Sequence, residues 1–392
     1  MKTSVLSCLA LAGFAIAGCS NPAVAGDNVI VTEPAPQITQ VMVTDEATFD
    51  EPWAMAFLPG SSDALITEKA GSLKLWQHGS KARDVAGVPR VSFGGQGGLG
   101  DVVPAPDYAA SHVIYLSWVE SGPKGTSGAV VARGKLELGS AAAQPRLTGL
   151  TVIWRQAPKV TGKGHFSHRI AFSPDGQFLF IASGERQKFT PAQDLKVNLG
   201  KIVRLNLDGT PAPENPFAGK PDADPQIWSY GHRNVLGLAF DARGQLWDLE
   251  HGPMGGDELN LVKPGSNYGW PLVSNGDNYD GTPIPRHATR PDLTAPAISW
   301  NPVIAPGDFI FYKGELFQGW KGQAICTGLA SGGLVRVATT VMTSGERAEE
   351  IERIPLGNRI RELREGPDGA LYILEDGAGG RLRKIVPAAA GS

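Results

Sequence analysis

The chain repeats one pattern: a stretch of alternating small and apolar residues, a turn, and a second apolar stretch. In its clearest copy, residues 169–182 read RIAFSPDGQFLFIA. Alternation with a period of two predicts β-strands, and Pro-Asp-Gly is a turn sequence, so each copy predicts two antiparallel strands joined by a tight turn. Six copies begin near Trp53, Gly98, Arg169, Gly237, Pro306 and Arg364.

This repeat predicts an all-β fold, a six-bladed β-propeller of four-stranded antiparallel blades, because spacings of roughly 45 to 70 residues suit one blade each. Each copy would form the inner half of a blade. The 50 glycines and 30 prolines agree, since they leave little room for long helices. Residues 382–386 are predicted to join the blade begun by the first strand and so close the ring. A β-sandwich is the competing all-β fold, but it does not explain the repetition.

The first residues have the character of a targeting segment. Lys2 precedes an apolar run at residues 5–17 that is too short to span a bilayer. The run ends in Ile-Ala-Gly-Cys at residues 16–19, which resembles a bacterial lipobox. We therefore predict cleavage before Cys19 and a lipid anchor on this cysteine. The alternative is a plain secretory signal that is cleaved near Ala25.

The predicted leader is the first of three segments into which we divide the chain. We expect a lipoprotein signal peptide at residues 1–18, a tether rich in Pro, Ala and Asn at residues 19–37, and the propeller domain at residues 38–388. Ser20 resembles the pattern that sorts lipoproteins to the outer membrane. The predicted location is the periplasmic side of a bacterial outer membrane, or the periplasm.

Charge and cysteine content narrow the possible functions. A formal net charge of −3 with both signs interspersed predicts no nucleic-acid partner. No Gly-x-Gly-x-x-Gly stretch opens a helix after a strand, and no Cys-x-x-Cys-His occurs, so neither a nicotinamide site nor an attached haem is predicted. Cys326 stands among apolar residues and glycines, which predicts a small core residue. The oligomeric state is left open.

Polar side chains gather just before the repeated strands. In a propeller the first strand of each blade lines the central channel, and the loops that enter these strands converge on one face. Cationic and amide groups at this position suit an anionic or carbonyl-rich ligand. The candidate residues are Gln96, His165, Arg233, Asn234, Arg359 and Arg361.

Taken together, these motifs resemble the soluble, pyrroloquinoline quinone (PQQ)-dependent aldose sugar dehydrogenases of the glucose/sorbosone dehydrogenase family. The resemblance runs from about Val43 to Ile385. It implies a six-bladed propeller that oxidises aldoses at C1. The most specific shared motifs are GQGGL at 95–99, HF at 165–166 with Arg169, QD at 193–194, GKIVR at 200–204, GHRNVLG at 231–237, EHGP at 250–253, GDE at 256–258, NYGWP at 267–271 and RIR at 359–361 with GPDG at 366–369.

The resemblance implies two catalytic residues. His165 resembles the general base that takes the proton of the C1 hydroxyl of the sugar while hydride passes to C5 of PQQ, and a neutral imidazole suits this step. Arg233 would polarise the quinone oxygen that gains charge. The sugar would leave as its lactone, and the electrons would pass to a quinone or another external acceptor.

The other candidates are implied to bind the cofactor and its metal. Cofactor contacts are expected from Gln96, Asn234, Arg359 and Arg361, and Trp300 resembles an aromatic residue that packs over the cofactor plane, with a core tryptophan as the alternative. Backbone carbonyls of Gly252 and Pro253 match the ligands of a calcium ion that bridges to PQQ.

Three acid or histidine residues near these motifs are given other expectations. Asp257 and Glu258 are the second-ranked metal ligands by residue type, because adjacent strand residues point to opposite faces and one of them would bond loop amides. His168 has no counterpart in the motif and is expected to be a strut at the rim of the channel.

Two departures from the family pattern bear on PQQ binding. A lysine of the fifth blade is usual in the family, whereas Ala330 occupies its place here, and a hydroxyl side chain is replaced by Val303. The loss of one charge-assisted contact would cost about 1.5–3 kcal/mol of binding free energy. Lys313, Lys321 or Arg336 could compensate.

Two other functions are left open by the sequence. One is a calcium-dependent lactone hydrolase, which would need several side-chain oxygens around a metal in the channel, from Asp101, Asp257, Glu258 and Asn234. The other is a lipid-anchored binding propeller that has lost its cofactor. The intact His165 disfavours the second, because a scaffold would not need this residue at the channel mouth.

Overall fold

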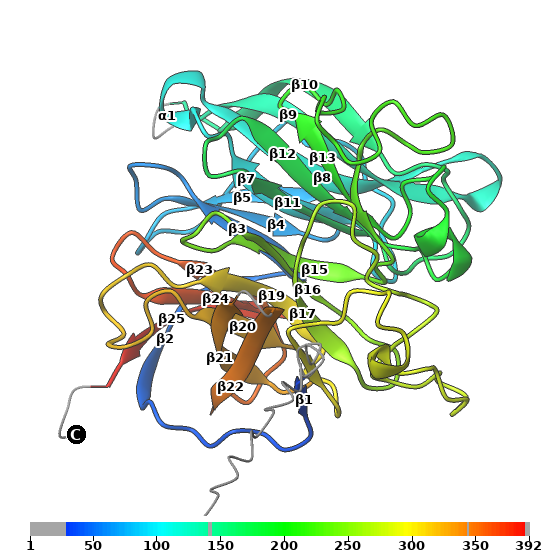
Figure 1. Ribbon diagram of the computed structural model, residues 1–392. Coiled ribbons are helices and arrows are strands. Elements are labelled where there is room, and N and C mark those ends of the chain that lie inside the picture. Colours follow the sequence, from blue (N-terminus) through cyan, green and yellow to red (C-terminus); the bar gives the residue numbers. More distant parts are fainter. Residues whose placement is uncertain (1–28, 140–142, 343–344, 389–392) are drawn as a thin grey trace, which may run out of the picture.

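The computed structural model of the chain describes residues 29–139, 143–342 and 345–388, and it confirms the predicted six-bladed β-propeller (Figure 1). The predicted signal peptide and Cys19, the predicted site of a lipid anchor, lie outside the described residues. Within the described part of the chain, no helix is long and apolar enough to cross a membrane.

Six antiparallel sheets form the blades. Blade 1 holds β3 (Pro52–Phe57), β4 (Ala64–Glu68), β5 (Ser72–Trp76) and β6 (Arg83–Asp84). Blade 2 holds β7 (Leu99–Pro104), β8 (Val113–Ser121), β9 (Ser127–Glu137) and β10 (Arg146–Arg155). Blade 3 holds β11 (Ser167–Phe172), β12 (Phe178–Ser183), β13 (Lys201–Asn206) and β14 (Ile227–Tyr230).

Blades 4 to 6 complete the ring. Blade 4 holds β15 (Val235–Phe240), β16 (Leu246–Glu250), β17 (Asp257–Leu261) and β18 (Ile298–Trp300). Blade 5 holds β19 (Pro306–Phe311), β20 (Ala324–Gly328), β21 (Gly333–Met342) and β22 (Gly345–Pro355). Blade 6 holds β23 (Ile360–Glu365), β24 (Leu371–Glu375), β25 (Gly380–Pro387) and β2 (Val41–Phe49). The described helices are short: α1 (Tyr108–Ser111) and the 3-10 turns η1 (Pro123–Gly125), η2 (Thr190–Gln193) and η3 (His287–Thr289).

The inner strands β3, β7, β11, β15, β19 and β23 contact one another in ring order, and each begins where a copy of the repeat was predicted. Closure also follows the prediction. Strand β25 at the end of the chain pairs with β2 from its beginning, with Ile385 opposite Val43. The first and last parts of the chain thus share one sheet, which fastens the ring.

The hydrophobic core is divided into layers between consecutive blades. One cluster joins Leu65 of blade 1 to Leu116 of blade 2, and another joins Ile325 of blade 5 to Ile373 of blade 6. Each blade therefore buries its two faces only against its neighbours, as the repeat predicts. Cys326 is fully buried in the layer between blades 4 and 5, where burial raises the pKa of its thiol, so it is the core residue that was expected.

The tether was predicted to extend to residue 37, but the structure shows the chain bound to the propeller earlier. Strand β1 (Val29–Val31) pairs in parallel with β18 and adds a fifth strand to blade 4. The backbone N–H of Ala35 then donates to Glu350 at 2.8 Å. This segment is held by an existing sheet edge and by a buried acid, and it has no core of its own. Its sequence therefore needs no apolar periodicity.

Candidate active site

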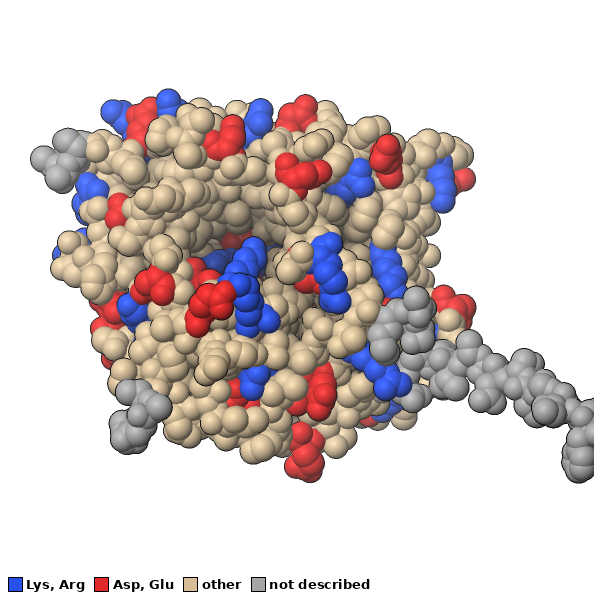
Figure 2. Space-filling view, turned by 60° about the vertical axis from the view of Figure 1, so that its left-hand side comes forward, with Lys and Arg blue, Asp and Glu red and all other residues tan. Residues whose placement is uncertain are grey.

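The entry ends of the inner strands surround a cavity of about 310 Å³. Of the residues predicted from the sequence, Gln96, Asn234, Arg359 and Arg361 line this cavity. The structure therefore brings together residues from the entry ends of three blades, 2, 4 and 6, that are far apart in the sequence. Figure 2 shows that one face of the molecule is hollowed near its centre, with basic and acidic side chains along part of the rim.

His165 does not itself line this cavity, but it precedes Phe166, which does, and it is paired with a buried acid that the sequence did not reveal. The backbone N–H of His165 donates to Gln96 Oε1 at 2.6 Å, and its Nδ1 contacts Glu185 Oε1. Glu185 is fully buried, and its Oε2 accepts the backbone N–H of Phe189 at 2.7 Å. Burial alone would raise the pKa of Glu185, but its bonds to His165 and to backbone amides hold the pKa below its usual value. Glu185 is therefore an ionised acceptor that keeps a proton on Nδ1 of His165.

The electrostatic surroundings keep the imidazole of His165 neutral. Burial is the largest cause that lowers its pKa, and the charges of Arg233 and Arg186 lower it further, although Glu185 acts in the opposite direction. With the ring proton held on Nδ1, the lone pair of Nε2 is available to accept a proton. This is the protonation state that a general base requires at neutral pH.

The backbone around His165 is strained. His165, Ser167 and His168 have φ values of 49°, 57° and 61°, in the left-handed region that non-glycine residues rarely adopt. Arg186, in the loop after β12 that also carries Glu185, has a φ of 65°. Such conformations cost of order 1–3 kcal/mol each and persist where the surroundings impose them, often at functional sites.

Arg233 is buried with part of its guanidinium unpaired; it lines a small neighbouring cavity together with Gly252 and Pro253, and the next residue, Asn234, lines the larger polar cavity. Its Nη1 donates to the carbonyl of His251 at 3.3 Å, and its Nη2 donates to the hydroxyl of Tyr279 at 3.4 Å. Its Nε is buried and has no hydrogen-bond partner among the described residues. A buried cation with an unsatisfied donor is positioned to bind an anionic or carbonyl oxygen.

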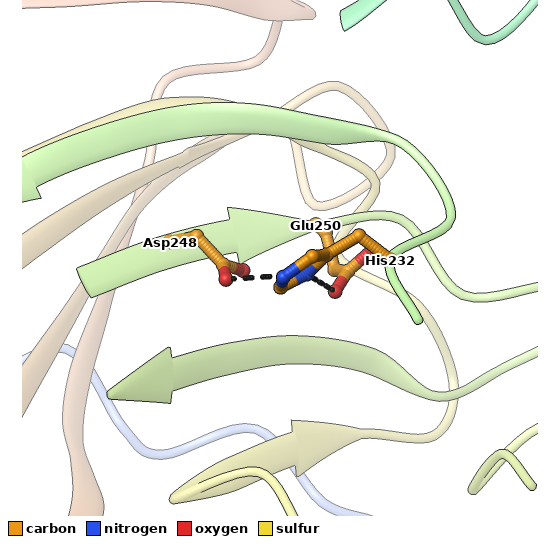
Figure 3. Close-up of side chains that lie close together, drawn as sticks. All are labelled: His232, Asp248 and Glu250. Atoms are coloured by element: carbon orange, nitrogen blue, oxygen red, sulfur yellow. Dashed lines mark hydrogen bonds and ion pairs between the residues drawn. The ribbon is translucent and has the colours of Figure 1, made fainter. Parts of the chain in front are cut away.

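His232, Asp248 and Glu250 form a buried cluster next to the backbone of Arg233. Figure 3 shows the three side chains of this cluster close together. Nδ1 of His232 lies 3.0 Å from Glu250 Oε1 and 3.5 Å from Asp248 Oδ2, and Glu250 Oε2 accepts the backbone N–H of Arg233 at 2.7 Å. Burial raises the pKa of Asp248 well above its ordinary value, with Glu250 as the next cause. The three side chains are buried and do not line the polar cavity, so their role is to fix the backbone at Arg233.

The remaining polar candidates present donors to the cavity. Gln96 and Asn234 use their side-chain oxygens to accept from His165 N and from Ser167 Oγ, the latter at 3.2 Å, which leaves their NH₂ groups as donors. Arg359 Nε and Arg361 Nε both bind Asp376, at 3.1 and 3.0 Å. The two arginines therefore meet on one wall, and they share a carboxylate that was not predicted from the sequence.

Gly252 and Pro253 lie beside this site, around a separate cavity of about 10 Å³ that Glu258 also lines. Asp257 turns the other way: its Oδ1 accepts the N–H of Gly252 at 2.9 Å and its Oδ2 accepts that of Ala305 at 2.7 Å. Of the two acids, Asp257 is thus the one that bonds loop amides, as strand alternation allows.

Two aromatic residues are placed differently from each other. Trp300 is not near the cavity: it is fully buried between blades 4 and 5, and its Nε1 donates to Glu350 Oε2 at 2.7 Å. The expectation of a residue stacked over a ligand does not fit this position, and the core alternative describes it, because β18 lies on the outside of the blade. His168 lines the cavity as a neutral strut, with Nδ1 2.8 Å from Ser117 Oγ and a pKa lowered to about 3 by burial, then Arg169.

None of the three basic residues that were expected to compensate for the absent lysine lines the polar cavity. Ala330 is exposed, and Lys321 and Arg336 are paired with Glu315 and Glu352 away from the cavity. The lysine that lines the cavity is Lys69, in the turn between β4 and β5. No sequence pattern pointed to Lys69, because it follows an inner hairpin and does not lie in an entry loop.

A larger cavity of about 840 Å³ lies at the other end of the inner strands, lined largely by apolar residues such as Phe57, Phe172 and Phe240. None of the predicted site residues lines it, although Lys313 does. We therefore take the polar cavity of about 310 Å³, and not this apolar one, as the candidate active site.

An ionic network closes the channel between the two cavities. Arg169 Nη2 lies 2.7 Å from Glu362 Oε2, and Arg364 Nη2 lies 2.7 Å from Glu362 Oε1. Asp101 and Asp308 complete the network, so three buried carboxylates face two guanidiniums. Burial raises the pKa of Glu362, despite the opposing charges of the arginines. The network joins blades 2, 3, 5 and 6 across the channel axis.

Replacing Arg169 with methionine is expected to destabilise the fold by about 3–5 kcal/mol, because it leaves buried carboxylates with a single cation. Thermal unfolding with and without denaturant would measure the change. Arg290→Met is the matched control, since Arg290 pairs with Asp292 on the surface, and it should unfold like the wild type. An Arg169→Met protein as stable as this control would show that the network does not hold the blades together.

The carboxylates that a metal-dependent hydrolase would need are not gathered in the channel cavity. Asp101 belongs to the ionic network, Asp257 bonds backbone amides, and Glu258 faces the smaller cavity. Among the described residues, the acid that lines the channel cavity is Asp376, which is committed to Arg359 and Arg361. This arrangement disfavours the lactone hydrolase alternative.

Comparison with known proteins gives a consistent result. A family model described as glucose/sorbosone dehydrogenase matches residues 49–384. The aldose sugar dehydrogenase YliI of Escherichia coli (strain K12) is 39% identical over 361 residues, covering 90% of this chain and 94% of that protein.

Two solved structures extend the comparison. The apo form of the soluble aldose sugar dehydrogenase from Escherichia coli has a TM-score of 0.81 at 38% identity, covering 89% of this chain and 100% of that chain. The PQQ-bound form of an aldose sugar dehydrogenase from Streptomyces coelicolor has a TM-score of 0.70 at 26% identity, covering 90% of this chain and 100% of that chain.

Proposed function

This chain belongs to the glucose/sorbosone dehydrogenase family and is a sugar dehydrogenase, and we propose that it oxidises aldoses at C1 to the lactone with PQQ and calcium. Electrons would leave to a quinone or another external acceptor. The observation that carries the proposal is that a neutral, acid-oriented His165 and a partly unpaired Arg233 stand next to Phe166 and Asn234, which line one polar cavity.

The residues present fit PQQ, which is flat and carries several carboxylates and carbonyls. Gln96 and Asn234 supply amide donors, Arg359 and Arg361 supply cations, and the buried Nε of Arg233 has no hydrogen-bond partner within the described part of the chain. Charge-assisted bonds from fixed guanidinium groups suit such a ligand in a cavity that excludes much water.

The residues also fit a calcium ion next to this cavity. The site lined by Gly252, Pro253 and Glu258 has oxygen donors, which are the ligands that calcium prefers, and its volume of about 10 Å³ suits one ion or water. The two backbone carbonyls are neutral, so the charge of the ion would be balanced by Glu258 and by a carboxylate of the cofactor.

When bound, PQQ would supply the two-electron acceptor for the hydride of the sugar C1. Nε2 of His165 would take the proton of the C1 hydroxyl, because Glu185 holds the other ring proton on Nδ1. Arg233 would stabilise the negative charge that develops at an oxygen beside it. Gln96 would keep the loop of His165 in place through its bond to the backbone N–H.

The first test is a titration of purified, metal-stripped protein with PQQ, with and without calcium. Cofactor absorbance and the quenching of tryptophan fluorescence would report binding. Calcium-dependent saturation near one equivalent, followed by reduction of a dye on addition of an aldose, is the expected result. A folded protein without PQQ binding would instead favour a binding propeller that has lost its cofactor.

For its location, we propose a lipid anchor through Cys19 on the periplasmic side of the outer membrane. The support is the lipobox-like sequence at residues 16–19. Cys19→Ser is expected to move the protein from the membrane fraction to the soluble periplasmic fraction. Membrane association that survives this substitution would count against the anchor.

A further inference from the structure

Lys69 brings a third cation to the wall of the active-site cavity that carries Arg359 and Arg361. Its backbone is fixed on both sides: its N–H donates to the carbonyl of Glu51 at 3.0 Å, and its carbonyl accepts the N–H of Leu99 at 2.9 Å. The turn between β4 and β5 is thereby tied to blade 2, so the side chain starts from a rigid position.

A glycine makes this close approach possible. A Cβ placed on Gly98 would lie 2.2 Å from the carbonyl oxygen of Lys69, and Gly98 has a φ of 133°. Any side chain at residue 98 would push the turn of Lys69 away from the cavity. The GQGGL motif therefore does two things: it presents Gln96, and it lets the turn that carries Lys69 pack against blade 2.

The charges on this wall do not cancel. Lys69 Nζ lies 3.1 Å from Glu51 Oε1, and Asp376 binds Arg359 and Arg361, so three cations face two carboxylates. Burial alone would raise the pKa of Asp376, but Arg361, Arg359 and Lys69 together hold it below its usual value. The three cations thus act on one region, which retains a net positive charge.

The exposure of Lys69 is consistent with a ligand contact. Its side chain is 14% exposed, whereas that of Arg359 is 58% exposed. A lysine so enclosed keeps few water contacts, and its single acid partner leaves two of the three ammonium protons for another acceptor. Lys313 and Lys321 have no such access to this cavity.

We propose that Lys69, from the first blade, binds a carboxylate of the cofactor together with Arg359 and Arg361, in the role for which the fifth blade here offers only Ala330. The inference rests on the proposed function, because it assumes that the cavity takes PQQ. It differs from the sequence expectation, which sought the compensating cation in blade 5.

The test compares PQQ affinity in the calcium-loaded protein, measured by fluorescence quenching. Lys69→Met is expected to weaken PQQ binding about 10- to 100-fold, as for the loss of a charge-assisted bond. Lys69→Arg should stay within about threefold of the wild type, since it keeps the charge. Lys313→Met, at the far cavity, is the matched control and should bind like the wild type.

A rescue experiment separates a ligand contact from a structural role. Adding Ala330→Lys to Lys69→Met should restore most of the lost affinity, because Leu329, next to Ala330, lines the same cavity. Lys69→Met should also make PQQ binding less sensitive to salt. If wild type binds PQQ and Lys69→Met binds equally well, the inference is wrong while the proposed function stands. If wild type does not bind PQQ, both fall.

Discussion

Replacing His165 with alanine is expected to lower the turnover of aldose by about 10²- to 10⁴-fold and to leave PQQ binding nearly unchanged. His165 bonds the protein through its backbone N–H to Gln96, and this bond survives the substitution. Only the imidazole, held by Glu185, is lost. Single-turnover reduction of bound PQQ by sugar would isolate the chemical step from binding and reoxidation.

The same variant gives a check on the pH dependence of catalysis. The pKa of His165 is lowered, chiefly by burial and then by Arg233 and Arg186. In the wild type, kcat/KM should therefore be full at neutral pH and fall only as the pH drops through a value below that of free imidazole, near 6.5. His165→Ala should lose this acid limb. A variant with wild-type turnover, or with the limb intact, would remove His165 from the proton transfer.

Much of the architecture was predictable because the repeat is a local signal. Each inner strand carries its own alternation and turn, and the layers between blades follow from repetition, so strand β19 was located from a weak copy near Pro306. Ring closure was predictable for a related reason: residues 382–386 form a last apolar strand after the sixth copy of the repeat, and this strand pairs both with β24 and with β2. The pairing of β1 was not predictable, because it depends on the sheet edge that β18 offers.

The site was predictable only where its residues come from entry loops. Gln96, Asn234, Arg359 and Arg361 line the cavity, whereas Trp300 does not, because an aromatic residue on an outer strand has the same local sequence whether it faces a ligand or a core. Lys69 was not predicted because it lies after β4, at the end of a hairpin, and not in an entry loop.

Glu185 was also not predicted from the sequence. Its replacement is the second change for which we expect a large loss of turnover. Glu185 lies in the loop after β12, where an acid without a motif has no distinguishing pattern. The structure makes it the orienting partner of His165, since one carboxylate oxygen faces Nδ1 and the other accepts backbone amides of Lys188 and Phe189. The role of Glu185 is visible only from these contacts in the structure, because no sequence motif surrounds it.

Glu185→Gln is expected to lower turnover by about 10²- to 10⁴-fold, because it would impose the wrong tautomer on His165. The amide oxygen of glutamine must face the N–H groups of Lys188 and Phe189, so its NH₂ would face Nδ1. Nδ1 would then become an acceptor, the ring proton would move to Nε2, and the base would lose its lone pair at the reacting position.

The tautomer argument can be separated from a loss of packing. Glutamine has nearly the volume of glutamate, so Glu185→Gln should fold and bind PQQ, and ¹⁵N chemical shifts of the His165 ring should report the proton on Nε2. Glu185→Asp is the matched variant: it keeps the charge and the Nδ1 proton but shortens the reach, and should lose less activity than the glutamine variant. Equal losses in the two variants, with an unchanged ring tautomer, would mean that Glu185 only fixes the position of the loop.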